Sequence, residues 1–413
     1  MKGSAADRQI LLRLAAEVME IARLDEQNER RSRWERLNSL EAERPLVWIN
    51  EIPWHELQGD ELRCTCIDPF CRDIESRLRT TLYLWRHMRT DMVVDPVFYT
   101  PKIYSDSGFG IAVHAPRGVS EYGRGSDDYV PLIRSEADID KIKIPQIAAD
   151  PQATERIAAQ TADLIGSVLP VQSRGVTHMW NAPWDVLITW WGVTELFMDM
   201  VERPNFVHLG ISRMMDALLG RLDQLEALGL LAAGDYNHRV GSGGLGITRE
   251  LPQPDFDGIH ARPIDQWGTS TGQIFSDVSP AMHDEFCLQH ELRWLERFGL
   301  NAYGCCEPLH HKGEMLKKIP RLRRVSMSRW IDLDRGVETI GDRWIFSYKP
   351  NPAVFAETRW DPEPARQELQ RMLERTRGCR VEIIMKDITT CRSDSQRLWD
   401  WCRMATEMAE SVA

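Results

Sequence analysis

The feature that most constrains this chain is the alternation, from Arg44 onward, of short apolar runs with long stretches of helical periodicity. Such alternation is typical of a parallel sheet whose strands are connected by helices. Eight runs can be counted, namely Pro45 to Ile49, Met92 to Tyr99, Gly175 to Trp180, Leu230 to Asp235, Asn301 to Cys305, Arg324 to Ser328, Trp344 to Tyr348 and Val381 to Met385. Eight strands separated by helices predict an α/β fold, a single closed (β/α)₈ TIM barrel over residues 44–413.

Length and charge fit this fold and narrow the range of partners. The 413 residues are 43% hydrophobic, which suits one extended barrel or two ordinary domains. A formal net charge of −11 disfavours binding to nucleic acid or anionic lipid. No apolar run approaches the roughly 18 to 20 residues that span a bilayer, and Met1 to Asp25 is too charged for a signal peptide. We therefore expect a cytoplasmic protein with a small-molecule substrate, no nucleic acid and no membrane partner.

Residues 1–43 are expected to form a helical extension ahead of the barrel. Ala5 to Glu43 has apolar residues at helical spacing, followed by a highly charged stretch around Arg30 to Arg36. The extension could be the arm of a homodimer, a lid over the site, or a cap on the bottom of the barrel.

Two stretches rich in Gly, Pro, Ser and Asp predict long irregular loops, Lys102 to Ile144 and Gly241 to Asp277. The second follows the fourth predicted strand, so in a barrel it should lie over the mouth of the site. Its segment Gly241 to Gly246 is glycine-rich but matches neither the P-loop nor a dinucleotide fingerprint. A flexible loop over the pocket is the better interpretation.

Four segments carry a resemblance to a known superfamily. They are Arg44 to Ile49, Glu195 to His208, Ser279 to Phe286 and Lys349 to Pro352, in the same order along the chain. Together they resemble the opening strand, a helix pair, a helix start and a late loop of the uroporphyrinogen decarboxylase-like superfamily. The resemblance spans nearly all of residues 44–407 and implies the same barrel.

The residues after the first strand depart from the true decarboxylases. Those enzymes have an Arg-Gln-Ala-Gly-Arg loop that binds porphyrinogen carboxylates, whereas this chain has Asn50 to Trp54, reading Asn-Glu-Ile-Pro-Trp. A carboxylate in place of a guanidinium reverses the charge offered to a polyacidic substrate. Asn50 and Glu51 are therefore candidates for binding a different substrate.

The fifth predicted strand points to the superfamily's corrinoid-linked methyltransferases, which end it with His-x-Cys-Gly and complete a zinc site from the eighth strand. Here the fifth strand leads into Gly304 to Pro308, with Cys305 and Cys306 but glycine at the histidine position. Asp387 stands where the second zinc ligand is expected, with Cys391 one turn later. The resemblance thus implies a variant zinc site and a corrinoid, or cobalamin, carried by a separate partner protein.

Zinc lowers the pKa of a bound thiol or alcohol, and a catalytic site needs about three protein ligands and one open position. Alignment with the superfamily favours Cys306 as the ligand, with Glu307, His238 or Asp387 as partners, and barrel enzymes keep their catalytic groups at the carboxyl ends of strands. Neighbouring side chains on a strand point to opposite faces, so Cys305 can join only if the strand has ended. Two buried structural thiols are the alternative.

Further candidates follow from position. Asp235, Asn237 and His238 end the fourth predicted strand, and Trp180, Trp267 and Tyr348 are aromatic groups that could line a pocket for a methylated substrate. His310 and His311 follow the cysteines but precede a helix, where capping or packing is more common. Cys64, Cys66 and Cys71 form an early cluster whose spacing fits no strong metal template, so ordinary loop thiols are expected.

Three functions therefore stay open. The leading one is zinc-assisted transfer of a methyl group between a small methylated substrate, or a thiol acceptor, and a corrinoid protein. The second is a decarboxylase-like carbon–carbon lyase for a small organic acid, with Glu307, His238 and Lys349 as acid, base and carboxylate ligand. The third is a non-catalytic binder of a metal or small molecule.

Overall fold

The structure is a computed structural model that describes residues 3–112, 130–234 and 237–412. Its strands are β1 (Leu46–Ile49), β2 (Phe98–Pro101), β3 (Tyr104–Asp106), β4 (Ile147–Ala149), β5 (Val171–Arg174), β6 (Trp267–Ser270), β7 (Leu300–Tyr303), β8 (Leu322–Met327), β9 (Ile345–Tyr348) and β10 (Arg380–Met385). Its α-helices are α1 (Ala5–Ala22), α2 (Asp25–Asn38), α3 (Pro69–His87), α4 (Glu136–Ile139), α5 (Pro151–Ile165), α6 (Pro183–Trp191), α7 (Val193–Glu202), α8 (Pro204–Ala227), α9 (Pro280–His283), α10 (Gln289–Leu295), α11 (Gly313–Leu316), α12 (Leu333–Ile340), α13 (Glu363–Arg375) and α14 (Ser395–Glu410).

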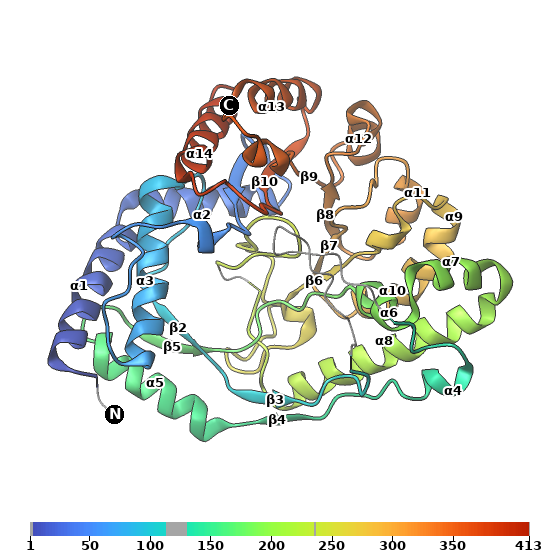
Figure 1. Cartoon of the computed structure of the whole chain (residues 1–413), viewed down its shortest axis with the longest axis horizontal. Helices are drawn as coiled ribbons and strands as arrows, with labels where there is room; N and C mark the ends of the chain where they lie inside the picture. The colour runs from blue at the N-terminus through green and yellow to red at the C-terminus, as the bar shows by residue number, and fades with distance from the viewer. Residues whose placement is uncertain (1–2, 113–129, 235–236, 413) are drawn as a thin grey trace.

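The centre of the fold is a six-stranded, all-parallel sheet in the order β1-β10-β9-β8-β7-β6. Helices pack along it, with α14 against β1, α12 against β9 and α10 against β6, and they form the outer rim in Figure 1. Two small sheets lie apart, the parallel pair β2-β5 and the antiparallel pair β3-β4. The predicted α/β class is confirmed, because strands joined by helices build one parallel sheet.

Backbone contacts also link the small parallel pair to the main sheet. The Asp91 N–H donates to the carbonyl of Val47 in β1, and Val176, just past β5, bridges in parallel to Leu231. The Gly234 N–H then donates to the carbonyl of Asp265, just before β6. These are single contacts and the continuous ladder ends at β1 and β6, so the closed eight-stranded barrel stays a prediction.

Five of the eight predicted strands are confirmed as β1, β7, β8, β9 and β10. The other three predictions need correction: Met92 to Tyr99 overlaps β2 only at its end, Gly175 to Trp180 follows β5, and Leu230 to Asp235 shows one bridge at Leu231 within its described part. Conversely, β6 lies inside the stretch expected to be an irregular loop. Its four residues are all buried, although three of them are Gly, Thr and Ser.

The first part of the loop predicted over the mouth packs against the sheet. Val240 to Thr248 are buried, and the Gly244 N–H donates to the carboxylate of Glu382 in β10 at 3.1 Å. A Cβ on Gly243 would lie 2.5 Å from the Arg324 side chain of β8. The glycines are therefore needed because this segment packs directly against polar side chains of the sheet. The other predicted loop, residues 102–144, contains β3 and α4, and its residues 113–129 lie outside the described part.

The N-terminal extension contacts the start of the strands. Trp34 and Leu37 of α2 share a buried cluster with Leu46 and Ile345, the first residues of β1 and β9. Helix α1 packs on α3 and α5 instead. Of the three interpretations of the extension, the packing of α2 agrees with a cap at the amino ends of the strands.

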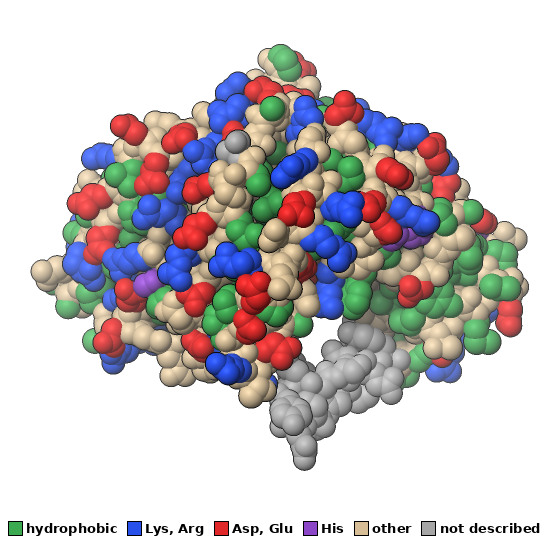
Figure 2. Space-filling model, turned by 90° about the horizontal axis from the view of Figure 1, so that it is seen from above, with side chains coloured by type: hydrophobic (Ala, Val, Ile, Leu, Met, Phe, Trp, Pro, Cys, Tyr) green, Lys and Arg blue, Asp and Glu red, His purple; other side chains and the backbone are tan. Residues whose placement is uncertain are grey.

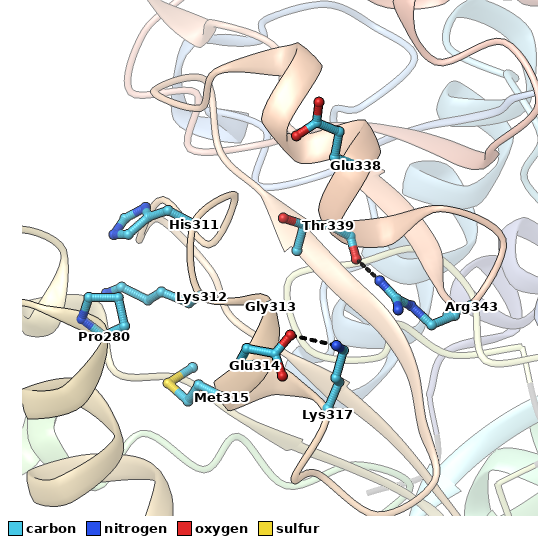
Figure 3. A pocket seen from close by; sticks show the side chains of 10 residues that line it. All are labelled: Pro280, His311, Lys312, Gly313, Glu314, Met315, Lys317, Glu338, Thr339 and Arg343. Atoms are coloured by element: carbon cyan, nitrogen blue, oxygen red, sulfur yellow. Dashed lines mark hydrogen bonds and ion pairs between the residues drawn. The ribbon is translucent and has the colours of Figure 1, made fainter.

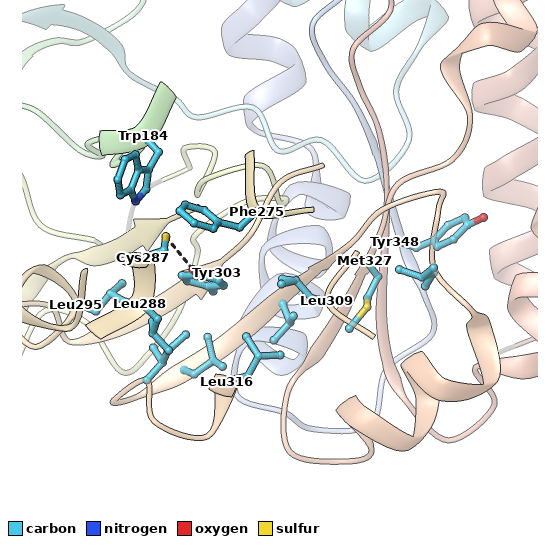
Figure 4. Packing of buried hydrophobic residues seen from close by; sticks show 14 of the residues in the cluster. Trp184, Phe275, Cys287, Leu288, Leu295, Tyr303, Leu309, Leu316, Met327 and Tyr348 are labelled. Carbon is cyan, nitrogen blue, oxygen red and sulfur yellow. Dashed lines mark hydrogen bonds between the residues drawn. The ribbon is translucent and has the colours of Figure 1, made fainter. Parts of the chain in front are cut away.

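The main core lies between the sheet and the surrounding helices. Figure 4 shows Tyr303, Met327 and Tyr348 in this layer, and these are the last residues of β7, β8 and β9. Side chains alternate between the two faces along a strand. The last residue of each of these strands points into the core, so the side chain of the next residue points to the opposite face of the sheet. That other face carries the polar groups described next.

Candidate functional site

The candidate site begins where β7 ends, at a glycine that changes the direction of the chain. Gly304 has φ +92°, a left-handed conformation that L-residues rarely adopt. A Cβ there would lie 2.5 Å from the Leu309 side chain. After this turn, the Sγ atoms of Cys305 and Cys306 lie 3.6 Å apart. The strand has therefore already ended before Cys305. This is the condition under which both cysteines could act together.

Lys386, which directly follows β10, brings a positive charge to this pair of thiols. Its Nζ lies 3.4 Å from Cys305 Sγ, 3.9 Å from Cys306 Sγ and 2.5 Å from the Asp387 carboxylate. Cys305 and Lys386 are buried, whereas Cys306 and Asp387 are exposed. One ammonium group thus faces two sulfur atoms, of which one is open to solvent.

The contacts divide the two thiols into different roles. The hydrogen bond from Cys305 lowers the pKa of Cys306, burial opposes this, and the Lys386 charge adds to it. The same hydrogen bond, together with burial, raises the pKa of Cys305. A thiolate rather than a thiol is the nucleophile in cysteine chemistry. Cys306 is therefore the thiol that is both accessible and favoured as a thiolate.

A second lysine approaches from β9. The Lys349 Nζ lies 2.9 Å from the Ser347 carbonyl and 2.5 Å from its Oγ. Lys349 is buried, and burial, joined by the charges of Lys386 and Arg324, lowers its pKa to about 7 against the opposing effect of Glu382. At neutral pH this amine is therefore divided between its protonated and neutral forms.

The two cysteines and two lysines line one small cavity at the carboxyl ends of β7, β8, β9 and β10. Its volume is about 130 Å³. It is lined by Cys305, Cys306, Ser328, Arg329, Trp330, Lys349, Pro350, Pro352, Lys386 and Asp387. Three cationic side chains and one carboxylate face the cavity, so it favours a small ligand that carries negative charge.

Beneath the cavity, the sheet holds a buried ion pair. The Arg324 Nε of β8 lies 3.2 Å from the Glu382 carboxylate of β10, and both side chains are almost fully buried. Ser347 of β9 also donates to Glu382. These contacts tie β8, β9 and β10 together below Lys349 and fix the position of Ser347, which in turn accepts from Lys349.

Glu307, predicted as a catalytic acid or metal ligand, is fully buried with its oxygens occupied. It accepts from the Thr271 hydroxyl at 2.8 Å, from the Gly272 N–H at 3.1 Å and from the Cys305 N–H at 2.9 Å. It is not among the residues that line the cavity. In this arrangement Glu307 positions the backbone of Cys305 and connects the end of β7 to that of β6.

Glu51 is one of the predicted substrate-binding residues, and its carboxylate is engaged by the protein. It accepts from Arg239 at 2.5 Å and from the Asp387 N–H at 2.9 Å. Burial would raise its pKa, but these partners lower it to about 2. Glu51 and Asp387 both have positive φ, of 52° and 58°, conformations that cost energy and concentrate at functional sites. Its neighbour Asn50 has buried amide atoms with no hydrogen-bond partner.

Several predicted site residues lie away from the cavity. Trp267 is fully buried and donates to the Gly246 carbonyl, and Asn237 donates to the Val93 carbonyl. Tyr348 points to the opposite face of the sheet, where it donates to Glu368. Cys391 is buried in the main core. These four are structural in this arrangement.

The remaining predictions have mixed outcomes. His238 is buried beside Gly246 and is not among the residues that line the cavity. Trp180 is 43% exposed near Gly241. Asp235 lies outside the described residues. Lys349 and Asp387 are in the cavity as predicted, while Lys386 was missed although it directly precedes Asp387.

The zinc that the resemblance implies would need about three protein ligands in one place. No group of three His, Cys, Asp or Glu side chains within the described ranges could hold a metal ion. In addition, the Lys386 ammonium stands beside both thiols and Asp387, where its positive charge would repel a divalent cation. The residues as arranged do not fit a zinc site.

The early cysteines likewise show no metal group among the described side chains. Cys66 and Cys71 are buried in the cluster formed around α1, α3 and α5, and burial raises the pKa of each. Cys64 is partly exposed, and its pKa is also raised, chiefly by burial. Cys66 and Cys71 therefore contribute to the packing of this cluster.

A second cavity of about 490 Å³ lies among the outer helices (Figure 3). Figure 3 shows that three of its charged groups already have partners: Lys317 pairs with Glu314, and Arg343 donates to the Thr339 carbonyl. His311 also lines it. It has no group comparable to the Cys306 thiol and is not the candidate site.

On the face seen in Figure 2, charged side chains do not gather by sign. Figure 2 shows acidic and basic side chains interspersed over the face in view, with no continuous basic area. No helix in the described part of the chain is long and apolar enough to cross a membrane.

Comparison with known proteins adds little. No family model matches the chain, and no curated protein matches it. Among solved structures, it is similar to a methyltransferase from Methanosarcina mazei, with a TM-score of 0.49 and 10% identity over 92% of this chain and 98% of that one. A similarity at this level carries no conclusion about the reaction of this chain.

Proposed function

We propose that this protein is a methyltransferase that moves a methyl group between a small substrate and a corrinoid held by a separate protein. The observation that carries the proposal is the exposed Cys306 thiol, which shares a cavity with Lys349 and Lys386 at the carboxyl ends of the strands. The resemblance of four segments to the uroporphyrinogen decarboxylase-like superfamily supports the corrinoid partner. The corrinoid, when bound, supplies a cobalt centre that can give or accept a methyl group.

In this proposal Cys306 is the group that handles the methyl. Its thiolate attacks the methyl carbon of a donor CH₃–XR, forming the S–CH₃ bond and releasing RX⁻. Lys386 favours the thiolate before attack and again when the sulfur later leaves, because an ammonium nearby lowers the energy of the anion. A second nucleophile then takes the methyl group and restores the Cys306 thiolate.

The two lysines and Arg329 act on the substrate. Their positive charges line a cavity that suits a small donor with a carboxylate or a similar anionic group. Lys349, with a pKa near 7, is suited to protonate RX⁻ as it leaves, since a general acid works best when its pKa is close to the working pH. Protonation gives neutral RXH, and Lys349 regains its proton from solvent.

The test is a two-part assay with the full-length protein. Incubation with a methyl donor alone should add the mass of one methylene group to a peptide containing Cys306. Addition of cob(I)alamin should then produce a methylcobalamin spectrum. A reaction that turns over fully without a corrinoid would reject methyl transfer to that partner. Metal analysis of the same sample separates direct transfer, which needs no zinc, from the zinc-assisted form.

The second candidate is a carbon–carbon lyase for a small organic acid. It is favoured by Lys349, which presents a partly neutral amine in a cavity lined with positive charge. A lyase needs no methyl donor. It releases carbon dioxide or another carbon fragment from the substrate, so its product is smaller than the substrate by that fragment. Release of carbon dioxide from a 2- or 3-oxo acid, lost in Lys349→Met but kept in Cys306→Ala, would favour this candidate.

A further inference from the structure

We infer that Cys305 and Cys306 form a reversible redox pair, which closes to a disulfide when a low-molecular-weight disulfide reacts with the exposed Cys306. This modification goes beyond the proposed methyl transfer and does not depend on it. Only its consequence, that oxidation switches off the site, rests on the proposed function.

The geometry brings the two sulfur atoms together on one side of the chain. Their separation is 3.6 Å, whereas neighbouring side chains within a strand point to opposite faces. The left-handed Gly304 ends the strand one residue earlier, and the Glu307 carboxylate holds the Cys305 N–H at 2.9 Å. The sulfur atoms need to approach by roughly 1.5 Å to reach bonding distance, which requires side-chain rotation and some distortion of the peptide between the two residues.

Exposure assigns the order of reaction. Cys306 is exposed and lines the cavity, while Cys305 is only 6% exposed. An incoming disulfide therefore meets Cys306 first, and Cys305 is placed to resolve the mixed disulfide from within. The Lys386 Nζ, at 3.4 Å and 3.9 Å from the two sulfur atoms, can stabilise a thiolate on either.

The charge of the cavity favours an anionic oxidant. Lys349, Lys386 and Arg329 line it against a single carboxylate, Asp387. Oxidised glutathione carries several carboxylates and is attracted by this balance of charge. Cavity size is no obstacle to the exchange, because the attacked sulfur atom needs to contact only the exposed Cys306.

The exchange balances in two steps. The Cys306 thiolate attacks one sulfur of RSSR, giving Cys306–S–SR and RS⁻. Cys305, as its thiolate, then attacks the Cys306 sulfur and expels a second RS⁻, while the protons of both thiols pass to the two RS⁻ groups. In total, two electrons move from the cysteine pair to the oxidant, which becomes two RSH.

The closed form should be easy to reduce. Adjacent Cα atoms are about 3.8 Å apart, which is shorter than the usual separation in protein disulfides of about 4.4 Å or more. Strained disulfides are more oxidising and serve as labile or regulatory bonds. The pair is therefore expected to open again with a monothiol at millimolar concentration rather than to act as a permanent crosslink.

The sequence offers a direct readout. Trypsin releases one peptide from Phe298 to Lys312 that contains Cys305 and Cys306 and none of the other cysteines. The folded protein is treated with oxidised glutathione, and its free thiols are then blocked. This peptide should carry no blocking group and should be lighter than the reduced peptide by two hydrogen atoms. Reduction before blocking should restore both groups.

Variants make the result specific. Cys305→Ser should stop at a stable glutathione adduct on Cys306, and Cys306→Ser should show neither adduct nor disulfide. Cys379→Ser, which changes a partly exposed cysteine outside the cavity, should behave as the wild type. A glutathione adduct that persists on wild-type Cys306, or two thiols that stay reduced while Cys379 reacts, would overturn the inference. Methyl transfer is not measured, so either proposal can fail alone.

Discussion

The Nζ of Lys386 lies 3.9 Å from the Sγ of Cys306, although the two residues are 80 positions apart in the sequence. Cys306 follows β7 and Lys386 follows β10, so two strands of the sheet lie between them in the order of hydrogen bonding. The parallel sheet is what makes the contact, because it brings all its carboxyl ends to one edge.

Replacement of Lys386 should change the reactivity of Cys306. In Lys386→Met, the thiolate loses a positive neighbour, so the pKa of Cys306 should rise and alkylation at neutral pH should slow. Lys386→Arg keeps the charge and serves as the control. The rate of iodoacetamide labelling of Cys306 as a function of pH measures the effect. An unchanged pH profile in Lys386→Met would show that the ammonium does not act on this thiol.

The two thiols should also differ in catalysis. Cys306→Ala should remove methyl transfer by a factor of about 100 or more, because it deletes the proposed nucleophile, while the fold stays intact. Cys305→Ala should be milder, since it removes only a supporting hydrogen bond. Initial rates with the same donor and cob(I)alamin compare the two. Equal losses in both variants would contradict the separate roles, and loss of bound zinc from Cys306→Ala would restore the metal-ligand interpretation.

Some of this site could be predicted from the sequence. Cys305, Cys306, Lys349 and Asp387 follow apolar runs that are recognisable strands, and groups at that position converge in a parallel sheet. Tyr348 and Lys349 were both predicted to lie in the site, but Tyr348 points to the helices and Lys349 enters the cavity. Consecutive residues of an extended chain point to opposite faces, so only one of the two could do so.

The rest depended on contacts that no periodicity reveals. Strand β6 reads Trp-Gly-Thr-Ser, which has little apolar content, and its hydroxyl groups are satisfied by Met179 and Asn181 from a distant segment. The glycine-rich segment around Gly244 looks like a surface loop in the sequence because it, too, has little apolar content. Its burial requires Glu382 and Arg324 as partners, and these partners become visible only in three dimensions.

Lys349 should make stability depend on pH. Its pKa is about 7 in the folded protein and near 10.4 when unfolded, so the unfolded state binds more protons between these values. Stability contributed by this group is therefore present at high pH and is lost as pH falls through the range from about 10 to about 7. Lys349→Met should remove this dependence and raise the free energy of unfolding at pH 7 by roughly 3 to 5 kcal/mol. Denaturant unfolding across this range measures it, and parallel curves for both proteins would contradict the prediction.

Gly304 should tolerate no larger residue. Gly304→Ala places a Cβ 2.5 Å from the Leu309 side chain and strains a backbone with φ +92°, at a cost of about 1 to 3 kcal/mol. The turn that brings the two thiols together would also shift, so disulfide closure should slow. Gly378→Ala is the control for the backbone effect, since Gly378 also has positive φ (88°) but nothing within 4 Å. Comparable disulfide closure in Gly304→Ala and the wild type would show that this turn does not set the thiol geometry.

Uroporphyrinogen should not be a substrate, despite the resemblance to its decarboxylase. Asn50 and Glu51 stand where that enzyme's carboxylate-binding loop begins, and the Glu51 carboxylate is held by Arg239 and the Asp387 N–H. This edge of the site therefore presents a paired carboxylate where the decarboxylases present arginines. The cavity of about 130 Å³ is also smaller than the roughly 300 to 1,000 Å³ of ordinary ligand pockets, and a tetrapyrrole needs more. Chromatography after incubation with uroporphyrinogen I or III should show no coproporphyrinogen, while a genuine decarboxylase assayed in parallel forms it. Coproporphyrinogen that accumulates with this protein would mean that the site opens to admit a tetrapyrrole and binds its carboxylates without the arginine loop.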